Sequence, residues 1–233
     1  MTLADTLNQD FARRVVVLPS EWVWTPSPAP GVSRMRLERN GGELARATSL
    51  VRFEPGALFP THEHGGGEEL LVVEGSTSDE HGEYLAGDYV RSPPGSRHSL
   101  RAGEQGATLF VKLRYFAPTD LLPLCVRTRS APWRPGVVPG LSVLPLHEHE
   151  AVSTALVRWA PDTRFALHRH GGGEEIFVIE GTFHDEHGVY PKGSWLRSPH
   201  LSAHAPFTAD DGATIFVKVG HVAALAASSG EQP

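Results

Sequence analysis

The sequence predicts an all-β protein made of two small β-barrels or sandwiches in tandem, and three observations lead to that fold class. The stretch His62–Glu69 recurs with one change as His168–Glu175, and many identical residues follow both copies. Short apolar segments alternate with turns, in keeping with 24 glycines and 19 prolines. No long segment has the apolar period of about 3.6 residues that marks an amphipathic helix. We therefore expect one unit in residues 1–120 and the other in residues 121–233.

Composition narrows the class of protein. A net charge of −6 and a pI near 6.1 argue against a general surface for nucleic acid or anionic membranes. No apolar run approaches the roughly 18–20 residues that span a bilayer, and the N-terminus lacks the apolar core of a secretory signal. Cys125 is the single cysteine, which excludes an intrachain disulfide and a cysteine-cluster zinc module. A reducing, cytoplasmic location is therefore expected.

The predicted strands follow from short apolar runs closed by turn residues. Arg14–Pro19 contains three valines and a leucine and ends at proline, so it is expected to be a strand. Residues 114–135 connect the units, and within them Leu124–Thr128 is expected to supply the first strand of the second unit. Further strands are expected at Ala47–Phe53, Thr154–Trp159, Leu70–Val73 and Ile176–Ile179, the last two buried on both faces, with hairpin turns at Asp79–Gly82 and Asp185–Gly188.

The repeated stretch carries residues that suit a metal ion. His62 and His64 are two residues apart, so on a strand both side chains point to the same face. The three glycines that follow permit a tight reversal, after which Glu68 begins the next strand and can return to the same ion. Closure of the barrel is expected to bring His98 to this group. Three imidazoles and a carboxylate suit Zn, Fe, Mn, Ni or Cu, and the second unit repeats the set as His168, His170, Glu174 and His204.

These intervals resemble the two sequence motifs of the cupin superfamily. The first motif is met in full by Gly56, His62, His64, Glu68 and Gly75. The second is met by Gly87, Pro93, Gly95 and His98, with Ala102 where the family has asparagine. The interval to the closing glycine selects Glu68 and Glu174 over the adjacent Glu69 and Glu175. In the second unit the turn positions depart from the pattern, with Asp162 and Leu201 in place of glycines and Thr208 in place of asparagine.

Among cupins, the H-x-H-x-G-G-E-E form followed by D-E-x-G-x-Y resembles the ChrR group, named after the C-terminal cupin of a zinc-dependent anti-sigma factor. The resemblance covers nearly the whole chain, twice. It implies two tandem cupin barrels of the double-stranded β-helix (jelly-roll) type, with one divalent metal per barrel. Residues 1–20 contain no histidine or cysteine, so the helical zinc module through which such regulators bind a sigma factor is not expected.

Other histidines and arginines have simpler readings. His147 and His149 form an H-x-H without the glycine turn, so a structural role is expected. His184 directly precedes the second hairpin turn, and His200 lies four residues before His204. For each of them, a structural role and a place in the wall of the second site are both open. Arg91 and its counterpart Arg197 could bind an anion in the barrel mouth, but pairing with a carboxylate on an outer face is expected, with Asp79 or Glu80 as candidates for Arg91.

Three functions are compatible with the sequence. The resemblance favours a metal-binding bicupin with a regulatory or sensing role, in which zinc holds the barrel. The alternative is an Fe(II)-dependent dioxygenase that cleaves a diketone or a hydroxylated aryl ketone, since iron would keep open positions for O₂ and substrate. A storage or isomerase-type cupin has the least support. Expected partners are metal ions, a small molecule in the barrel and, as a homodimer, a second copy of the chain. No catalytic side chain is assigned.

Overall fold

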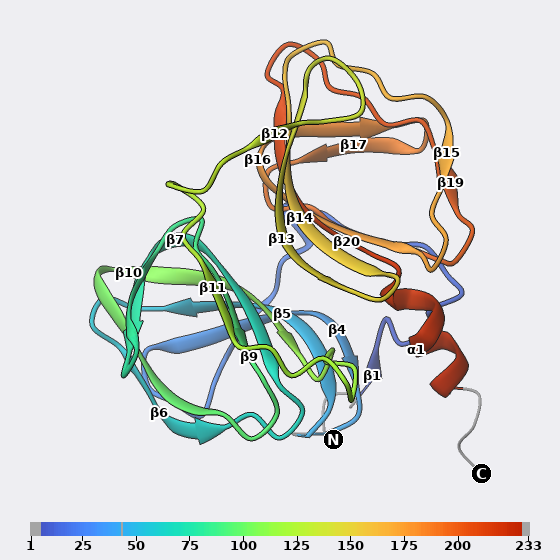
Figure 1. Ribbon diagram of the computed structural model, residues 1–233. Helices are drawn as coiled ribbons and strands as arrows, with labels where there is room; N and C mark the ends of the chain where they lie inside the picture. Colours follow the sequence, from blue (N-terminus) through green and yellow to red (C-terminus); the bar gives the residue numbers. More distant parts are fainter. Residues whose placement is uncertain (1–5, 43, 230–233) are drawn as a thin grey trace. The chain divides into compact units, whose positions relative to one another are not determined.

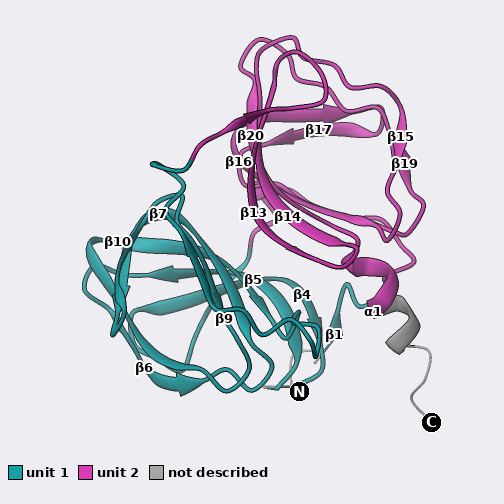
Figure 2. Ribbon diagram, in the orientation of Figure 1, with its two compact units in different colours: residues 1–9, 23–131 teal, residues 10–22, 132–233 magenta. Residues whose placement is uncertain are grey.

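The computed structural model describes residues 6–42 and 44–229 and divides the chain into two compact units (Figures 1 and 2). The first unit comprises Met1–Gln9 and Val23–Ala131, and the second comprises Asp10–Trp22 and Pro132–Pro233. Both units are built from antiparallel strands, which confirms the all-β prediction with two repeats. Each unit is described by itself below.

The first unit is one curled sheet of ten strands. Its main path runs β1-β4-β5-β10-β7-β9-β11, with β3 on β4, β6 on β10 and β8 on β7. The long strand β10 pairs with β5, β6 and β7 along its length, which closes the sheet into a barrel. The strands are β1 (Thr6–Leu7), β3 (Trp24–Pro26), β4 (Val32–Asn40), β5 (Arg46–Phe53), β6 (Leu58–Glu63), β7 (Glu68–Asp79), β8 (Gly82–Leu85), β9 (Tyr89–Ser92), β10 (Arg97–Leu113) and β11 (Leu124–Val126).

The second unit repeats this plan with a sheet ordered β12-β13-β14-β20-β16-β18-β2, with β17 on β16, and a separate β15-β19 pair. Among the described residues, no helix is long and apolar enough to cross a membrane. The elements are β2 (Val15–Val17), the short 3₁₀ helix η1 (Pro19–Glu21), β12 (Arg134–Pro135), β13 (Leu141–His149), β14 (Val152–Trp159), β15 (His168–Arg169), β16 (Glu174–Asp185), β17 (Gly188–Pro191), β18 (Trp195–Ser198), β19 (Ala203–His204), β20 (Ala213–Val219) and α1 (His221–Ser229).

Each sheet has an edge strand, β11 or β2, that comes from a part of the sequence expected to belong to the other unit. The strand predicted at Arg14–Pro19 forms as β2, but it pairs with β18 in the second unit. The strand within Leu124–Thr128 forms as β11, but it pairs with β9 in the first unit, so its expected place in the second unit is wrong. A short apolar run marks a strand without specifying the sheet edge that it joins. The expected bounds of the two units, residues 1–120 and 121–233, stay a prediction.

The strand that follows each glycine turn is buried on both faces, as predicted. Leu70 and Val72 point into the first barrel, whereas Leu71 lies between them on the opposite face and is equally buried. In the second barrel Ile176 and Val178 belong to the interior cluster. The hairpin turns also form where predicted, because Asp79 pairs with Gly82 and Asp185 with Gly188 across two-residue loops.

Candidate metal centres

The first barrel gathers the four residues predicted from the motif. His62 lies on β6, Glu68 begins β7, and His98 lies on β10 directly opposite His62. The Nε2 atoms of His64 and His98 are 3.0 Å apart, and Glu68 Oε1 lies 3.5 Å from His98 Nε2 and 3.8 Å from His64 Nε2. One ligand atom from each of the four lies within 4.8 Å of the others. Four donors this close can hold one divalent cation.

The glycine turn between His64 and Glu68 brings the two ends of the motif together. Gly67 has φ +79°, a conformation that side chains rarely adopt, and a Cβ there would strike the ring of Phe116. The amide of Gly67 donates to the carbonyl of His64 and closes the turn. This geometry explains why the motif requires glycine at that position.

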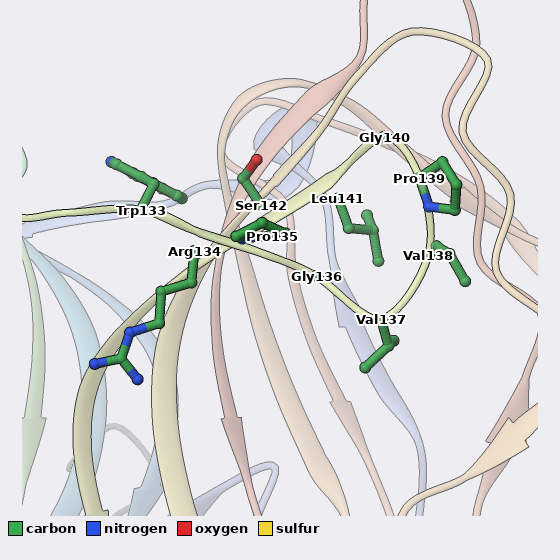
Figure 3. A pocket seen from close by; sticks show the side chains of 10 residues that line it. All are labelled: Trp133, Arg134, Pro135, Gly136, Val137, Val138, Pro139, Gly140, Leu141 and Ser142. Atoms are coloured by element: carbon green, nitrogen blue, oxygen red, sulfur yellow. The ribbon is translucent and has the colours of Figure 1, made fainter.

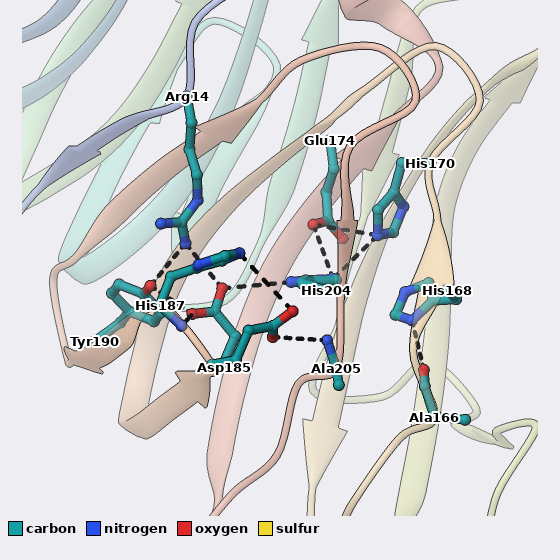
Figure 4. A network of polar contacts seen from close by, with 11 residues as sticks. Arg14, Ala166, His168, His170, Glu174, Asp185, His187, Tyr190, His204 and Ala205 are labelled. Atoms are coloured by element: carbon teal, nitrogen blue, oxygen red, sulfur yellow. Dashed lines mark hydrogen bonds and ion pairs between the residues drawn. The ribbon is translucent and has the colours of Figure 1, made fainter.

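The second barrel repeats the arrangement with His168 on β15, His204 on β19 and Glu174 at the start of β16 (Figure 4). The Nε2 atoms of His170 and His204 are 3.0 Å apart, and Glu174 Oε2 lies 3.5 Å from the first and 3.4 Å from the second. The three histidines form a group with ligand atoms within 4.8 Å. Glu174 lies beside His170 and His204 but is not part of this three-histidine group.

The departures from the family's glycine pattern leave the backbone geometry in place. Asp162 has φ +55°, close to the +69° of Gly56 in the first unit. Leu201 has φ +61°, where its counterpart Gly95 has +84°. The second unit therefore keeps both left-handed turns, at the cost of modest strain in residues that have a Cβ.

Hydrogen bonds behind the histidines fix which ring nitrogen faces the site. The Nδ1 atoms of His62 and His168 each lie 3.0 Å from a backbone carbonyl oxygen two residues earlier, so Nδ1–H donates and Nε2 is left to face a cation. Asp79 Oδ2 lies 3.4 Å from His98 Nδ1, and Asp185 Oδ2 lies 3.6 Å from His204 Nδ1.

The two aspartates were not predicted as part of the sites. The sequence does contain a signal for them, because both units have an aspartate five residues before a tyrosine. Tyr84 and Tyr190 donate from their hydroxyls to Asp79 and Asp185, at 2.8 Å and 2.7 Å respectively. Each tyrosine thus holds the carboxylate that orients a histidine.

The second site has a further cation that the first lacks at the matching place. Arg14 donates to Asp185 at 2.8 Å and to the hydroxyl of Tyr190 at 2.6 Å (Figure 4). Arg14 directly precedes β2, which pairs with β18 as β11 pairs with β9, so the corresponding residue before β11 is Pro123. Because this strand joins the second unit unexpectedly, Arg14 could not be placed from the sequence.

Burial controls the pKa values of the first site. Burial, followed by the charges of His98 and His62, lowers the pKa of His64 to about 3. Burial and then the charge of His62 lower the pKa of His98 against the opposing effect of Asp79. Burial and the charge of Asp79 raise the pKa of Glu68 to about 8, although the charge of Arg34 opposes them. His64 and His98 are therefore held neutral, which is the form that binds metal.

The second site differs from the first in the direction of the pKa shift of one histidine. Burial lowers the pKa of His170 to about 4 and raises that of Glu174 to about 7. For His204, burial is the largest single effect and lowers the pKa, but the hydrogen bond to Asp185 and the charge of Glu174 together raise it. The pKa of Asp185 falls to about 2, because its hydrogen bonds, including that from His204, outweigh its burial.

The donor atoms of the first site fit a cation. Glu68 Oε1 is buried and has no hydrogen-bond partner among the described residues, a costly arrangement for a carboxyl oxygen. It faces the Nε2 atoms of His64 and His98, which are neutral and converge on the same point. A divalent cation would satisfy all three atoms at once.

The two barrels differ in the space beside these residues. A cavity of about 560 Å³ opens onto the first site, with His62, His64 and Glu68 in its wall. The cavity beside the second site measures about 260 Å³, and residues 135–137 contribute to its wall. These residues belong to the loop Trp133–Ser142, which also borders an open hollow of about 530 Å³ that has no histidine or carboxylate in its lining (Figure 3).

Residues outside the motifs mostly have structural roles. Among the described residues, no metal-capable group includes His147 or His149. His184 stacks on Phe207, and His200 accepts a hydrogen bond from the Gly172 amide, so neither joins the ligand atoms of the second site.

The paired arginines lie on the outer faces of the sheets. Arg91 is buried and makes a two-pronged pair with Asp120, and it also lies 3.8 Å from Glu69. Its expected pairing with a carboxylate is therefore right, but the partner is neither Asp79 nor Glu80. Arg197 donates to the backbone carbonyl of Asp10.

The family follows from the match of the whole chain to a known domain. The ChrR cupin-like domain matches twice, over residues 12–117 and 123–223. The chain belongs to the ChrR cupin-like family. The search of curated proteins gives no match. The family assignment agrees with the duplicated His/Glu groups and supports binding of divalent metal by this cupin fold.

Several solved structures share the fold. A Nostoc punctiforme protein described as a putative dioxygenase aligns with a TM-score of 0.70 and 16% identity, covering 93% of this chain and 83% of that one. Lactobacillus farciminis oxalate decarboxylase in complex with formate gives 0.67 and 13%, covering 93% and 89%. A variant of Bacillus subtilis oxalate decarboxylase gives 0.66 and 16%, covering 88% and 76%. At these identities the likeness concerns the fold alone.

Proposed function

We propose that this ChrR-type bicupin holds one divalent metal in each barrel and that the first barrel is a metal-dependent oxygenase site for a small organic molecule. His62, His64, Glu68 and His98 would hold the first metal. An Fe(II) ion there would supply open coordination positions for O₂ and for a chelating substrate such as a diketone or hydroxylated aryl ketone. The likeness in fold to a protein described as a putative dioxygenase supports this choice.

The observation that carries the proposal is the cavity of about 560 Å³ whose wall includes three of the four donor residues. Its size is within the usual range of small-molecule sites. Its other walls are largely apolar, so they would bind the body of a substrate and exclude water from it. The second barrel offers about half that space, which supports a structural role for its metal, held by His168, His170, Glu174 and His204.

The test begins with anaerobic purification and measurement of the metal bound per chain. Oxygen uptake is then followed with a β-diketone and with a hydroxylated aryl ketone. We expect iron-dependent uptake that His98→Ala abolishes and that His204→Ala leaves substantially in place. Two tightly bound zinc ions per chain with no oxygen uptake from either substrate, even after exchange for iron, would refute the oxygenase.

The second candidate is the regulatory role, in which metal occupancy is the signal. The buried carboxyl groups of Glu68 and Glu174 favour it, because both have raised pKa values that a bound cation would bring back down. Metal binding would then be coupled strongly to the stability of each barrel. Under this reading zinc is the expected metal, and a reducing cytoplasm is the expected setting because Cys125 is the only cysteine.

A further inference from the structure

The cavity of the first barrel has an unusual charge for a space with largely apolar walls. Arg34, Arg39 and Arg114 all line it, against the two carboxylates Glu63 and Glu68. Glu63 is exposed and pairs with Arg97 at 2.6 Å, and Glu68 is the proposed metal ligand. The remaining charge of the cavity wall is therefore positive, and a divalent cation at the site would make it more so.

The three arginines are placed differently. Arg39 donates to the carbonyls of Gly41 and Gly42, so its guanidinium is engaged by the loop at the end of β4. Arg114 packs its aliphatic stem over the glycine turn, where a Cβ on Gly66 would strike it. Both side chains are therefore held against nearby backbone.

Arg34 is connected to the proposed metal group through an aromatic neighbour. Its guanidinium carbon is 5.8 Å from the ring centre of Phe59, and that ring packs edge-on against His62 at 4.8 Å. The guanidinium, the aromatic ring and a donor histidine thus follow one another along the cavity wall. Since arginine keeps its charge at any physiological pH, this wall carries a fixed cation beside apolar surface.

The second barrel lacks this feature. Val143 pairs with Val157 as Arg34 pairs with Val51, so a valine occupies the equivalent position. The lining of the second cavity contains no arginine or lysine. The cation is therefore a property of the first cavity and not of the cupin fold in general.

We propose that the first barrel selects organic anions, and that Arg34 binds a carboxylate carried by the substrate on its apolar body, away from the group that meets the metal. A planar guanidinium matches a carboxylate with two parallel hydrogen bonds, and the apolar walls strengthen the pairing by excluding water. The proposal rests on the proposed function only in taking this cavity as the place where the substrate binds.

The test is calorimetric binding to the metal-loaded protein of residues 1–233 without oxygen, using three probes that share one apolar body. These are benzoylacetone, its para-carboxylated analogue, and the methyl ester of that analogue. The carboxylate is expected to bind at least about tenfold more tightly than the ester. Arg34→Gln is expected to remove that preference, and Arg34→Lys to restore part of it.

Arg52→Gln serves as the matched control, because Arg52 is exposed on the neighbouring strand, stacks on Trp24 and does not line the cavity. Melting temperatures and metal content verify that each variant is folded and loaded. Equal binding of carboxylate and ester, a preference that survives in Arg34→Gln, or binding of none of the probes would overturn the proposal. The readout requires no turnover, so an inactive protein with an Arg34-dependent preference would refute only the oxygenase.

Discussion

Replacing Glu68 by glutamine should stabilise the metal-free protein at alkaline pH while removing the stability gained from metal. The pKa of Glu68 rises from 4.5 to about 8 on folding. Because the folded value is the higher one, its contribution to stability is full below about pH 4.5 and is lost as the pH rises through about 8. At about 1.4 kcal/mol per pKa unit, the loss by pH 8 is roughly 4 kcal/mol, less whatever local relaxation recovers.

Urea unfolding in the presence of a chelator measures this effect at about pH 5 and about pH 8. Wild type is expected to lose stability between the two values relative to Glu68→Gln, because the variant has no carboxyl group to ionise. With zinc added at neutral pH the order should reverse, since the variant has lost one of four donors. Glu104→Gln, a change at an exposed residue, is the control and should follow wild type. If Glu68→Gln and wild type show the same pH dependence without metal, the reasoning from burial is refuted.

Three further outcomes are expected. Gly75→Ala should lower the free energy of unfolding by about 2 kcal/mol more than Gly56→Ala. Both glycines have positive φ, but only a Cβ on Gly75 would meet the Gly106 carbonyl. Urea unfolding compares the two variants, and equal losses would contradict the steric argument. Asp185→Asn should weaken the metal affinity of the second site by about 10–100-fold in a chelator competition, because Asp185 orients His204. An unchanged affinity would contradict that role. On acidification of the metal-free protein, His204 should take up its proton at a higher pH than its counterpart His98, because the pKa of His204 is raised and that of His98 is lowered. NMR titration of the two imidazoles measures this, and the reverse order would contradict the assignment.

The repeat made the fold and the grouping of the candidate ligands predictable, because both depend on local spacing. His62 and His64 share a face by strand geometry alone, and the glycine turn returns Glu68 to them. Asp79 escaped prediction although it is repeated, because a carboxylate in a hairpin turn usually has a local role. Here the same residue supports the turn and lies against the ring of His98.

The contributions of Arg14 and Arg34 depended on tertiary structure. Arg14 reaches the second site because β2 pairs with β18, a choice of sheet edge that no local pattern encodes. Arg34 lines the first cavity because β4 turns this side chain inward, whereas a charged residue on a strand would ordinarily be expected to face water.

The exchange of β2 and β11 has a consequence for dissecting the protein. The chain passes from the first unit to the second before residue 10, returns before residue 23, and leaves again after residue 131, so the units share three covalent connections. A fragment cut at the middle of the sequence would leave the C-terminal piece without its edge strand, with the backbone of β18 exposed to unintended pairing. A faithful single-barrel fragment of the C-terminal half would need residues 10–22 joined to residues 132–233 by a new linker, and a single proteolytic nick after residue 131 would leave the two pieces associated through β2.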